Sequence, residues 1–274
     1  MKHSLWLAVP LFLLSCRKDP PAAGNFSEDR LKIAGYAVNT YSSVPRLNSK
    51  YLVVFDAGLG DYSKVWRDSK VPDSLLATTD VVLYDRAGYN NTPAPPSPRN
   101  VERMSADLDS VIRQYANGRK VVLVSHSLGG YIARDYAIKN PAKVAALLFV
   151  DPSHELYNGL LDQPTEDQIY NAFRSLYGAG YGATLEAREL IEDAQYMATL
   201  PPLPAIPVTV ITSMLTDAGH DAADRQLWFQ AHEMLGNGVR DFTHLTTTIS
   251  GHYIMKTEPG LVKTQIRALL SRLP

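Results

Sequence analysis

The chain has 274 residues, a length that favours one large domain over two. Hydrophobic residues make up 45% and charged residues 20%, which excludes a disordered or fibrous chain. Lys and Arg total 27 against 28 Asp and Glu, so no basic excess exists to bind nucleic acid, and one cysteine, Cys16, cannot form an internal disulfide or a zinc cluster.

The N-terminus has the pattern of a secretion signal. Lys2 supplies a positive charge, and residues 5–14 form an apolar run that only Pro10 interrupts. This run is shorter than the about 20 residues that a membrane-spanning helix needs, and it fits the apolar core of a signal peptide. The run ends in Leu13-Leu14-Ser15-Cys16, which resembles a bacterial lipobox. The resemblance implies cleavage before Cys16 and attachment of a lipid to this residue.

This interpretation divides the chain and predicts its location. Residues 1–15 are expected to be the signal peptide, residues 16–30 the lipidated cysteine with a polar, proline-rich tether, and residues 31–274 the folded domain. A lipid on Cys16 would make the membrane a partner and place the protein in the bacterial cell envelope. Arg17 stands where many lipoproteins retained at the inner membrane have Asp, which favours the outer membrane.

From about Leu31 the chain alternates short apolar runs with amphipathic stretches. Strands are predicted at residues 50–55, 80–84, 120–124, 144–150, 207–212 and, more exposed, 245–250. Helices are predicted at residues 101–115, 131–138 and 260–273. This alternation predicts an α/β fold, with a mainly parallel central sheet and helices on both faces.

Residues 154–205 interrupt the alternation, because they contain aromatic and helical segments but no strand candidate. An insertion of this length between two strands is predicted to be a helical cap, although an elaborated connection without a role is the alternative. Four aromatic residues of the insertion are candidates to line a pocket beneath it: Tyr157, Tyr170, Phe173 and Tyr177.

The segment VLVSHSLGGY, residues 122–131, joins a buried strand to a helix through small residues. A nucleophile on such a turn needs small neighbours, because the backbone is strained and the helix packs close to the strand. Gly129 and Gly130 meet that need, and Ser125 replaces the first glycine of G-x-S-x-G. We therefore predict Ser127 as a nucleophile at a helix N-terminus, where the dipole favours negative charge. The alternative is a glycine-rich turn with a surface serine.

Two further segments would complete a site around Ser127. The loop in VVFDAGLG, residues 53–60, can present backbone N–H groups, so the amides of Leu59 and Leu128 are predicted to form an oxyanion hole. A serine hydroxyl also needs a base to take its proton. Among seven histidines, His252 is the best candidate because it follows the last predicted strand, in the chain order nucleophile, acid, base.

From about Lys50 to Pro274 the chain resembles the α/β-hydrolase superfamily, in particular its serine-nucleophile, esterase- or lipase-like bacterial members. Four motifs carry the resemblance in the right order: YDRAG at 84–88, HSLGG at 126–130, VDPSH at 150–154 and SGHY at 250–253. The resemblance implies a Ser-acid-His triad and no metal or organic cofactor. Asp56-Ala57-Gly58 departs from the His-Gly of many relatives, which leaves the oxyanion amides in place but alters the side chains around them.

The acid of the triad has two candidates. The resemblance places it after either of two strands, as Asp151 or as Asp217, with Asp221 a poorer option. The Asp217 position is the commoner one in the superfamily, but Asp151 follows its strand without a gap and is slightly favoured. His220 and Asp221 lie near Asp217 without spaced partners, so no metal site is predicted.

The predicted function is hydrolysis of a carboxylic ester through an acyl-enzyme intermediate. The balanced charge favours a neutral small molecule as substrate. Amide, peptide, thioester or lactone hydrolysis would use the same triad, and a non-catalytic surface-binding lipoprotein could keep the same fold.

Overall fold

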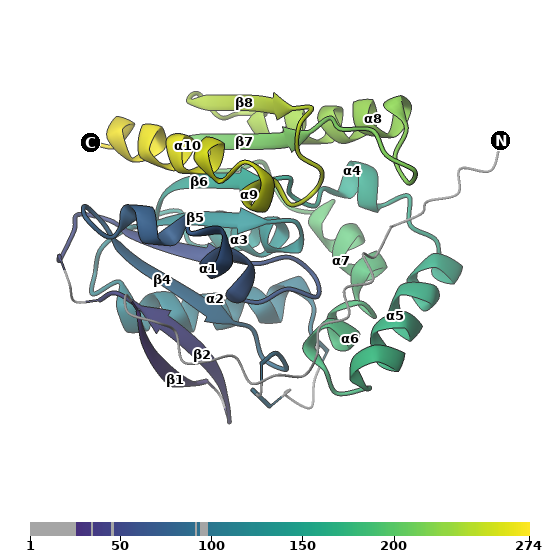
Figure 1. Cartoon of the computed structure of the whole chain (residues 1–274), viewed down its shortest axis with the longest axis horizontal. Coiled ribbons are helices and arrows are strands. Elements are labelled where there is room, and N and C mark those ends of the chain that lie inside the picture. Colours follow the sequence, from purple (N-terminus) through teal and green to yellow (C-terminus); the bar gives the residue numbers. More distant parts are fainter. Residues whose placement is uncertain (1–25, 34, 45–46, 91, 94–97) are drawn as a thin grey trace.

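The computed structural model describes residues 26–33, 35–44, 47–90, 92–93 and 98–274. Within them, eight strands form one sheet in the order β1-β2-β4-β3-β5-β6-β7-β8 (Figure 1). β1 (Ser27–Ile33) pairs antiparallel with β2 (Tyr36–Ser42), which pairs antiparallel with β4 (Asp80–Asp85). The pairs from β4 across to β8 are parallel, through β3 (Leu52–Asp56), β5 (Val121–His126), β6 (Val144–Val150), β7 (Val208–Ser213) and β8 (Phe242–Thr247). The sheet is therefore mainly parallel, as predicted.

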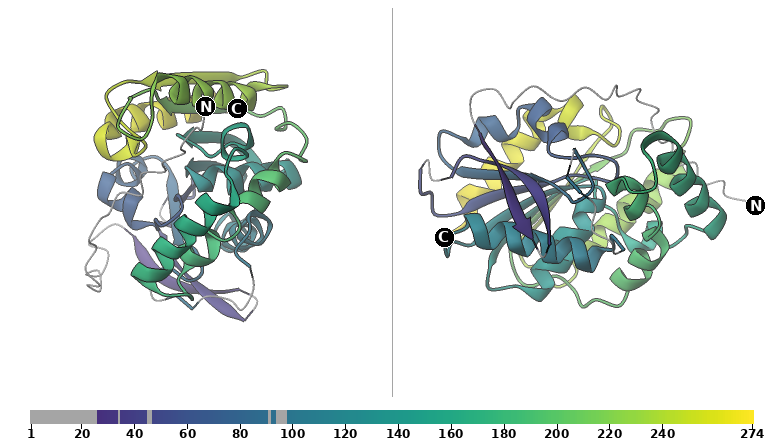
Figure 2. Two further views of the ribbon diagram at one scale, coloured as in Figure 1. Left: turned by 90° about the vertical axis from the view of Figure 1, so that its right-hand side faces the viewer. Right: turned by 90° about the horizontal axis from the view of Figure 1, so that it is seen from below.

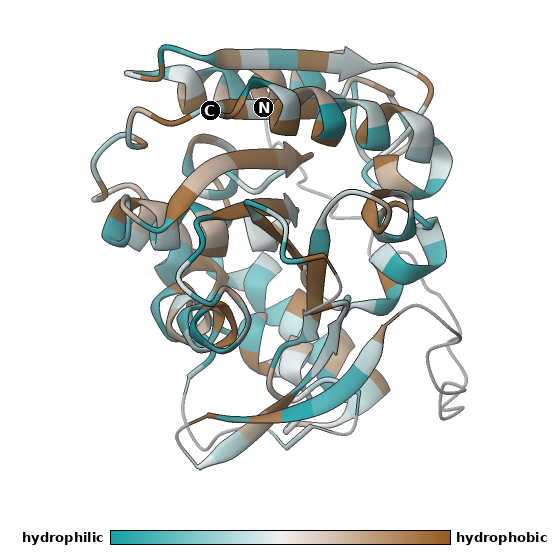
Figure 3. Ribbon diagram, turned by 90° about the vertical axis from the view of Figure 1, so that its left-hand side faces the viewer, coloured by the Kyte–Doolittle hydropathy of each residue, from teal (hydrophilic) through white to brown (hydrophobic). Residues whose placement is uncertain are grey.

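The central strands are buried along their whole length and mostly apolar, because both faces of the sheet are covered. Successive side chains of a strand point to opposite faces. Val53 and Val122 accordingly belong to one buried cluster, whereas Val54 and Leu123 belong to the other. In Figure 3 the central strands are mostly brown, whereas the surrounding helices mix brown and teal residues.

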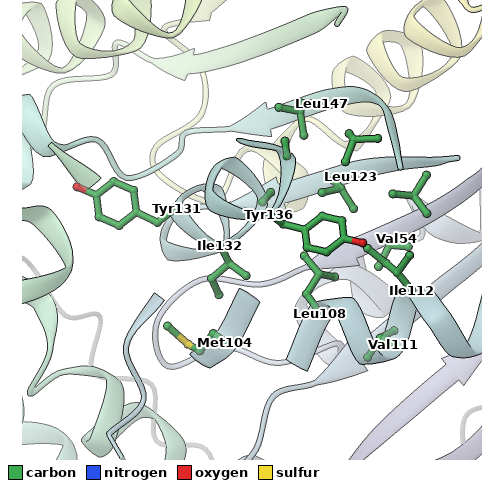
Figure 4. Close-up of a cluster of buried hydrophobic side chains, with 14 of the residues drawn as sticks. Val54, Met104, Leu108, Val111, Ile112, Leu123, Tyr131, Ile132, Tyr136 and Leu147 are labelled. Atoms are coloured by element: carbon green, nitrogen blue, oxygen red, sulfur yellow. The ribbon is translucent and has the colours of Figure 1, made fainter. Parts of the chain in front are cut away.

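Each face of the sheet has its own helices. α2 (Val101–Tyr115) and α3 (Leu128–Lys139) cover one face, and α1 (Lys64–Ser69) and α10 (Pro259–Arg272) cover the other. Figure 4 shows Met104 and Leu108 of α2 beside Ile132 and Tyr136 of α3. Truncating a buried leucine such as Leu108 to alanine typically costs about 2–5 kcal/mol.

Short elements complete the framework. A 3₁₀ turn, η1 (Pro72–Leu75), follows α1, and a second one, η2 (Met234–Gly236), follows α8 (Ala222–Glu233) beside β7. α9 (Ile254–Thr257) directly precedes α10 and follows the loop that carries His252. That loop lies at the carboxyl end of the sheet, where the site is built.

The predicted insertion is helical. All of residues 154–205 are described, and they contain no strand but four helices: α4 (Glu155–Asn158), α5 (Gln163–Tyr177), α6 (Gly182–Glu186) and α7 (Leu190–Met197). Figure 2 shows these helices gathered on one side of the molecule, beyond the carboxyl ends of the parallel strands.

The N-terminal strands differ from the sequence prediction. β1 and β2 were not predicted, and β1 begins at Ser27, inside the segment 16–30 that was expected to be a tether. The first four residues of β1 are exposed, so this edge strand lacks the apolar run that identified the central strands. β8 begins at Phe242 rather than at Leu245. The sequence misplaced its bounds because the strand is only partly buried and its threonines give no clear apolar pattern.

Cys16 and the predicted signal lie outside the described residues. Among the helices that the structure does describe, none has the length and apolarity that crossing a membrane requires.

Candidate active site

Ser127 lies in a sharply bent backbone between β5 and α3. Its φ is 51° and its ψ is −123°, directly after the strand and directly before the helix. A positive φ costs a residue with a Cβ atom about 1–3 kcal/mol, and it persists only where the surrounding structure holds it. The bend raises the Ser127 side chain at the N-terminus of α3, as the sequence predicts for a nucleophile elbow.

Backbone hydrogen bonds and close packing hold this bend. The N–H of Ser127 donates to the carbonyl of Val150 over 3.3 Å, and its carbonyl accepts from the amides of Gly130 at 2.8 Å and Ser153 at 3.0 Å. A Cβ atom on Gly130 would lie 2.6 Å from Cβ of Pro152, closer than side chains can approach. The glycine therefore lets α3 pack against the segment that follows β6.

His252 and Asp151 form a hydrogen-bonded pair beside Ser127. His252 Nδ1 lies 2.7 Å from Asp151 Oδ2, although the two residues are 101 positions apart. Because an ionised carboxylate only accepts, Nδ1 carries the proton and Nε2 is left as a potential base. Ser127, His252 and Asp151 line the same pocket, so the structure brings the three predicted residues together.

The carboxylate of Asp151 is buried and fully engaged. Besides His252, it accepts hydrogen bonds at Oδ1 from the amide of Ser213 at 2.9 Å and from Trp228 Nε1 at 2.8 Å. Burial raises the pKa of Asp151, but the hydrogen bonds from His252 and Ser213 and the charge of His252 outweigh it, so the pKa is lowered. The group is thus built to stay ionised beneath the histidine.

Asp217, the other candidate acid, lies elsewhere. It sits in a loop before α8, where its Oδ1 accepts from the amides of Gly219 at 2.8 Å and His220 at 2.9 Å. Its Oδ2 pairs with Arg225 at 3.4 Å, and 44% of its side chain is exposed. These contacts hold the loop in shape and tie it to α8, and Asp221 caps the N-terminus of α8.

His126 supports the loop that carries His252. The His126 ring is buried, and its Nε2 lies 3.0 Å from the carbonyl oxygen of His252, which fixes the proton on Nε2. Burial, and next the nearby His252, lower the pKa of His126 well below its usual value. His126 is therefore a neutral group, and its hydrogen bond holds the backbone of His252 in place.

The predicted oxyanion amides flank Ser127. Leu128 is the first residue of α3, and Leu59 follows Gly58 in the loop after β3. A Cβ on Gly58 would lie 2.9 Å from Cβ of Ser127, so this loop passes directly beside the serine. Across the described residues, the loop and turn hydrogen bonds leave the N–H groups of Leu59 and Leu128 without a backbone acceptor. Both donors are thus available to an oxygen near Ser127.

The pocket holds about 600 Å³ of empty space, a volume that includes its opening to the solvent. Its lining combines the predicted site with aromatic and polar side chains, namely Ser127, Asp151, Ser153, Tyr157, Asn158, His220, Asp224, Arg225, Trp228 and His252. Of the aromatic candidates in the cap, Tyr157 lines it. Phe173 and Tyr170 instead pack in a cluster that also contains Tyr89 and Leu59, and Tyr177 stacks on Phe173. Among the described residues, no cluster of His, Cys, Asp and Glu could hold a metal ion.

Sequence reasoning missed several residues that build this site. Ser213 ends β7 and Trp228 lies on α8, and no local motif links either residue to Asp151. Their contacts arise only when the parallel strands bring the ends of β6 and β7 together. His126 belonged to a recognised motif, but its bond to the His252 loop spans 126 positions.

A mostly parallel sheet with a serine elbow after a central strand defines the α/β-hydrolase class of proteins. The family model described as "alpha/beta hydrolase fold" matches residues 51–197. The chain belongs to this family.

Similar proteins share this fold but differ in activity. The human "(Lyso)-N-acylphosphatidylethanolamine lipase" is 30% identical over 116 residues, which are 41% of this chain and 33% of that enzyme. A "Putative carbamate hydrolase RutD" of Klebsiella pneumoniae is 31% identical over 159 residues, which are 56% of each chain. A thermophilic esterase from Thermogutta terrifontis superposes with a TM-score of 0.66 at 16% identity, covering 90% of this chain and 98% of that one. The match to the human enzyme thus spans about a third of its length.

Proposed function

We propose that the protein is a serine hydrolase that cleaves small-molecule carboxylic esters. The observation that carries the proposal is the 2.7 Å contact between His252 Nδ1 and Asp151 Oδ2 in the pocket that Ser127 also lines. Nucleophile, base and acid on this fold make up the machinery of acyl transfer.

The proposed reaction proceeds in two halves. His252 Nε2 takes the proton of Ser127 as its Oγ attacks the ester carbonyl, and the amides of Leu59 and Leu128 stabilise the oxyanion. The tetrahedral intermediate collapses, His252 gives the proton to the leaving alcohol, and the acyl group stays on Ser127. Water, activated by His252, then releases the acid and restores the serine. Asp151 keeps the proton on Nδ1 and stabilises the imidazolium.

Amide and carbamate hydrolysis is the second candidate, because the same triad serves it and a carbamate hydrolase is among the similar proteins. Peptide, thioester and lactone substrates would use the same steps. Asp-nucleophile chemistry is disfavoured, because the elbow carries a serine.

A fluorophosphonate probe on the full-length, detergent-solubilised protein tests the proposal. We expect wild type to be labelled at Ser127, and Ser127→Ala to lose both the label and turnover of a panel of chromogenic esters and amides. Ser153→Ala is the matched control, because Ser153 lines the same pocket, and it should keep the label. An unlabelled wild type would instead indicate a binding protein.

We further propose that a lipid on Cys16 anchors the protein to the outer membrane. The lipobox-like Leu13-Leu14-Ser15-Cys16 supports this proposal. In a bacterial host, an alkyne analogue of palmitate should label wild type and Ser127→Ala but not Cys16→Ser, and only the two labelled proteins should fractionate with the outer membrane. Membrane association of Cys16→Ser equal to wild type would contradict the anchor.

A further inference from the structure

Arg86 of the YDRAG motif connects the loop after β3 with the cap. The residue is 2% exposed and follows β4. Its guanidinium donates to the carbonyls of Ala57 at 2.6 Å and Gly58 at 2.7 Å and to Asp56 Oδ1 at 2.9 Å. On its other side it makes a bidentate pair with Glu186, at 2.8 and 2.9 Å. One buried cation thus ties α6 to the loop after β3 that carries the Leu59 amide, which we call the oxyanion loop.

Tyr89 provides a second link between the same two segments. Its hydroxyl donates to Glu186 Oε2 at 2.6 Å and accepts from the amide of Gly60 at 3.1 Å. The cap fits closely over it, because the amide of Gly182 donates to the carbonyl of Gly88 at 2.9 Å and a Cβ on Gly182 would lie 2.4 Å from the Tyr89 ring. The residues on both sides of Leu59 are therefore held, Gly58 by Arg86 and Gly60 by Tyr89.

The buried ion pairs of Arg86 with Asp56 and Glu186 are expected to add little to the stability of the fold. Asp56, Arg86 and Glu186 are each at most 3% exposed, and desolvation largely cancels the Coulombic gain of such buried ions. Apolar residues of similar volume are often equally stabilising at such positions. The polar contacts instead converge on the backbone that carries the Leu59 amide, where a small displacement is costly for catalysis.

We propose that Arg86, Tyr89 and Glu186 are positioning residues that hold the Leu59 amide in the oxyanion hole, so that α6 of the cap is part of the catalytic framework. The inference rests on the proposed serine-hydrolase function. It gives the buried arginine of the YDRAG motif a role, and it supplies side-chain support for a loop in which Asp56-Ala57-Gly58 departs from the His-Gly of many relatives.

Two conservative variants of the full-length protein test the proposal. Tyr89→Phe keeps the ring beneath Gly182 but removes the hydroxyl, and Glu186→Gln keeps the shape but removes the charge that faces Arg86. Tyr136→Phe and Asp80→Asn are matched controls, because they remove a tyrosine hydroxyl bonded to Asp109 and a buried partner of Arg119 elsewhere in the fold.

The readouts are kcat and KM on a chromogenic ester and the inhibition constant of a boronic acid, whose tetrahedral adduct on the serine places an oxygen in the oxyanion hole. We expect kcat to fall about 10- to 100-fold in the two test variants, with KM changed much less and boronate affinity falling in parallel. The controls should stay within about twofold of wild type for all three quantities, because they lie away from the oxyanion loop.

Two results would overturn the proposal. In the first, Tyr89→Phe and Glu186→Gln lower kcat no more than the controls do. In the second, they lower activity and melting temperature together while boronate affinity of the folded fraction is unchanged, which would indicate a purely structural role. Failure of the underlying function is distinguishable, because wild type itself would then neither turn over esters nor react with the fluorophosphonate.

Discussion

Replacing Asp151 with asparagine tests whether Asp151 sets the tautomer of His252, because the histidine itself stays in place. Asp151 Oδ1 accepts from the Ser213 amide and from Trp228 Nε1, so an asparagine would keep its carbonyl oxygen on that side. Its NH₂ group would then face His252 Nδ1, 2.7 Å away in the present pair. Two donors cannot share that contact, so His252 would carry its proton on Nε2 instead.

A histidine protonated on Nε2 cannot accept the proton of Ser127. We therefore expect Asp151→Asn to lower kcat by about 10⁴-fold, about 5.4 kcal/mol of transition-state stabilisation. Stability should change by less than about 3 kcal/mol, the upper end for one charged hydrogen bond. Asparagine also tolerates the φ of 46° at this position, whereas most residues do not.

The assay compares ester turnover and urea unfolding of Asp151→Asn with those of Asp217→Asn. Asp217 is bonded to its own exposed loop and to Arg225 but not to His252, so its variant should keep kcat within about threefold of wild type. If Asp217→Asn lost activity by orders of magnitude while Asp151→Asn kept it, the assignment of the acid and the reasoning from the tautomer would be wrong.

Two other perturbations follow from the packing and the charges. Gly58→Ala would press a Cβ to 2.9 Å from Ser127 Cβ and 3.0 Å from His126 Nδ1. We expect kcat to fall about 10- to 100-fold and the overpacking to lower the free energy of unfolding by about 1–3 kcal/mol; unaltered turnover would contradict this packing. Asp193 accepts from the amide of Val101, and burial raises its pKa from 3.8 to about 8. The folded state thus binds a proton that the unfolded state releases, and the free energy of unfolding should fall as pH rises from 3.8 to about 8, by up to about 1.4 kcal/mol per unit. Asp193→Asn should remove that slope in urea titrations at pH 5 and 8, and an identical slope in the variant would show that other groups cause it.

The elements that the sequence predicts well are those whose signal is local. The strand at 144–150 and the helix at 101–115 have the predicted bounds, because each is an uninterrupted apolar run or an apolar stripe in its own residues. β1 escaped prediction because it is an edge strand that exposes most of its side chains. Its strand conformation comes from hydrogen bonding to β2 rather than from a pattern in its own residues.

The site required contacts that no local pattern contains. The sequence placed Ser127 at a strand-to-helix turn from its own neighbours, but the choice between Asp151 and Asp217 depends on where the loop after β8 returns. The link between Arg86 and Glu186 likewise spans 100 positions. Such pairs follow from the order of the strands and the docking of the cap, which are properties of the assembled chain.

The bent backbone at Ser127 is directly bonded to the end of β6 and to the segment that follows it. Its amide reaches the last residue of β6, its carbonyl accepts from Ser153, and the amide of Asp151 donates to Ile211 of β7 at 2.8 Å. Local opening that released the serine would also break its bond to β6, a neighbouring strand of the buried sheet. We therefore expect these amides to exchange with the most protected cooperative unit of the protein rather than as part of a fraying loop. The site should therefore survive heating until the sheet itself unfolds, so that thermal inactivation reports on the core of the whole domain.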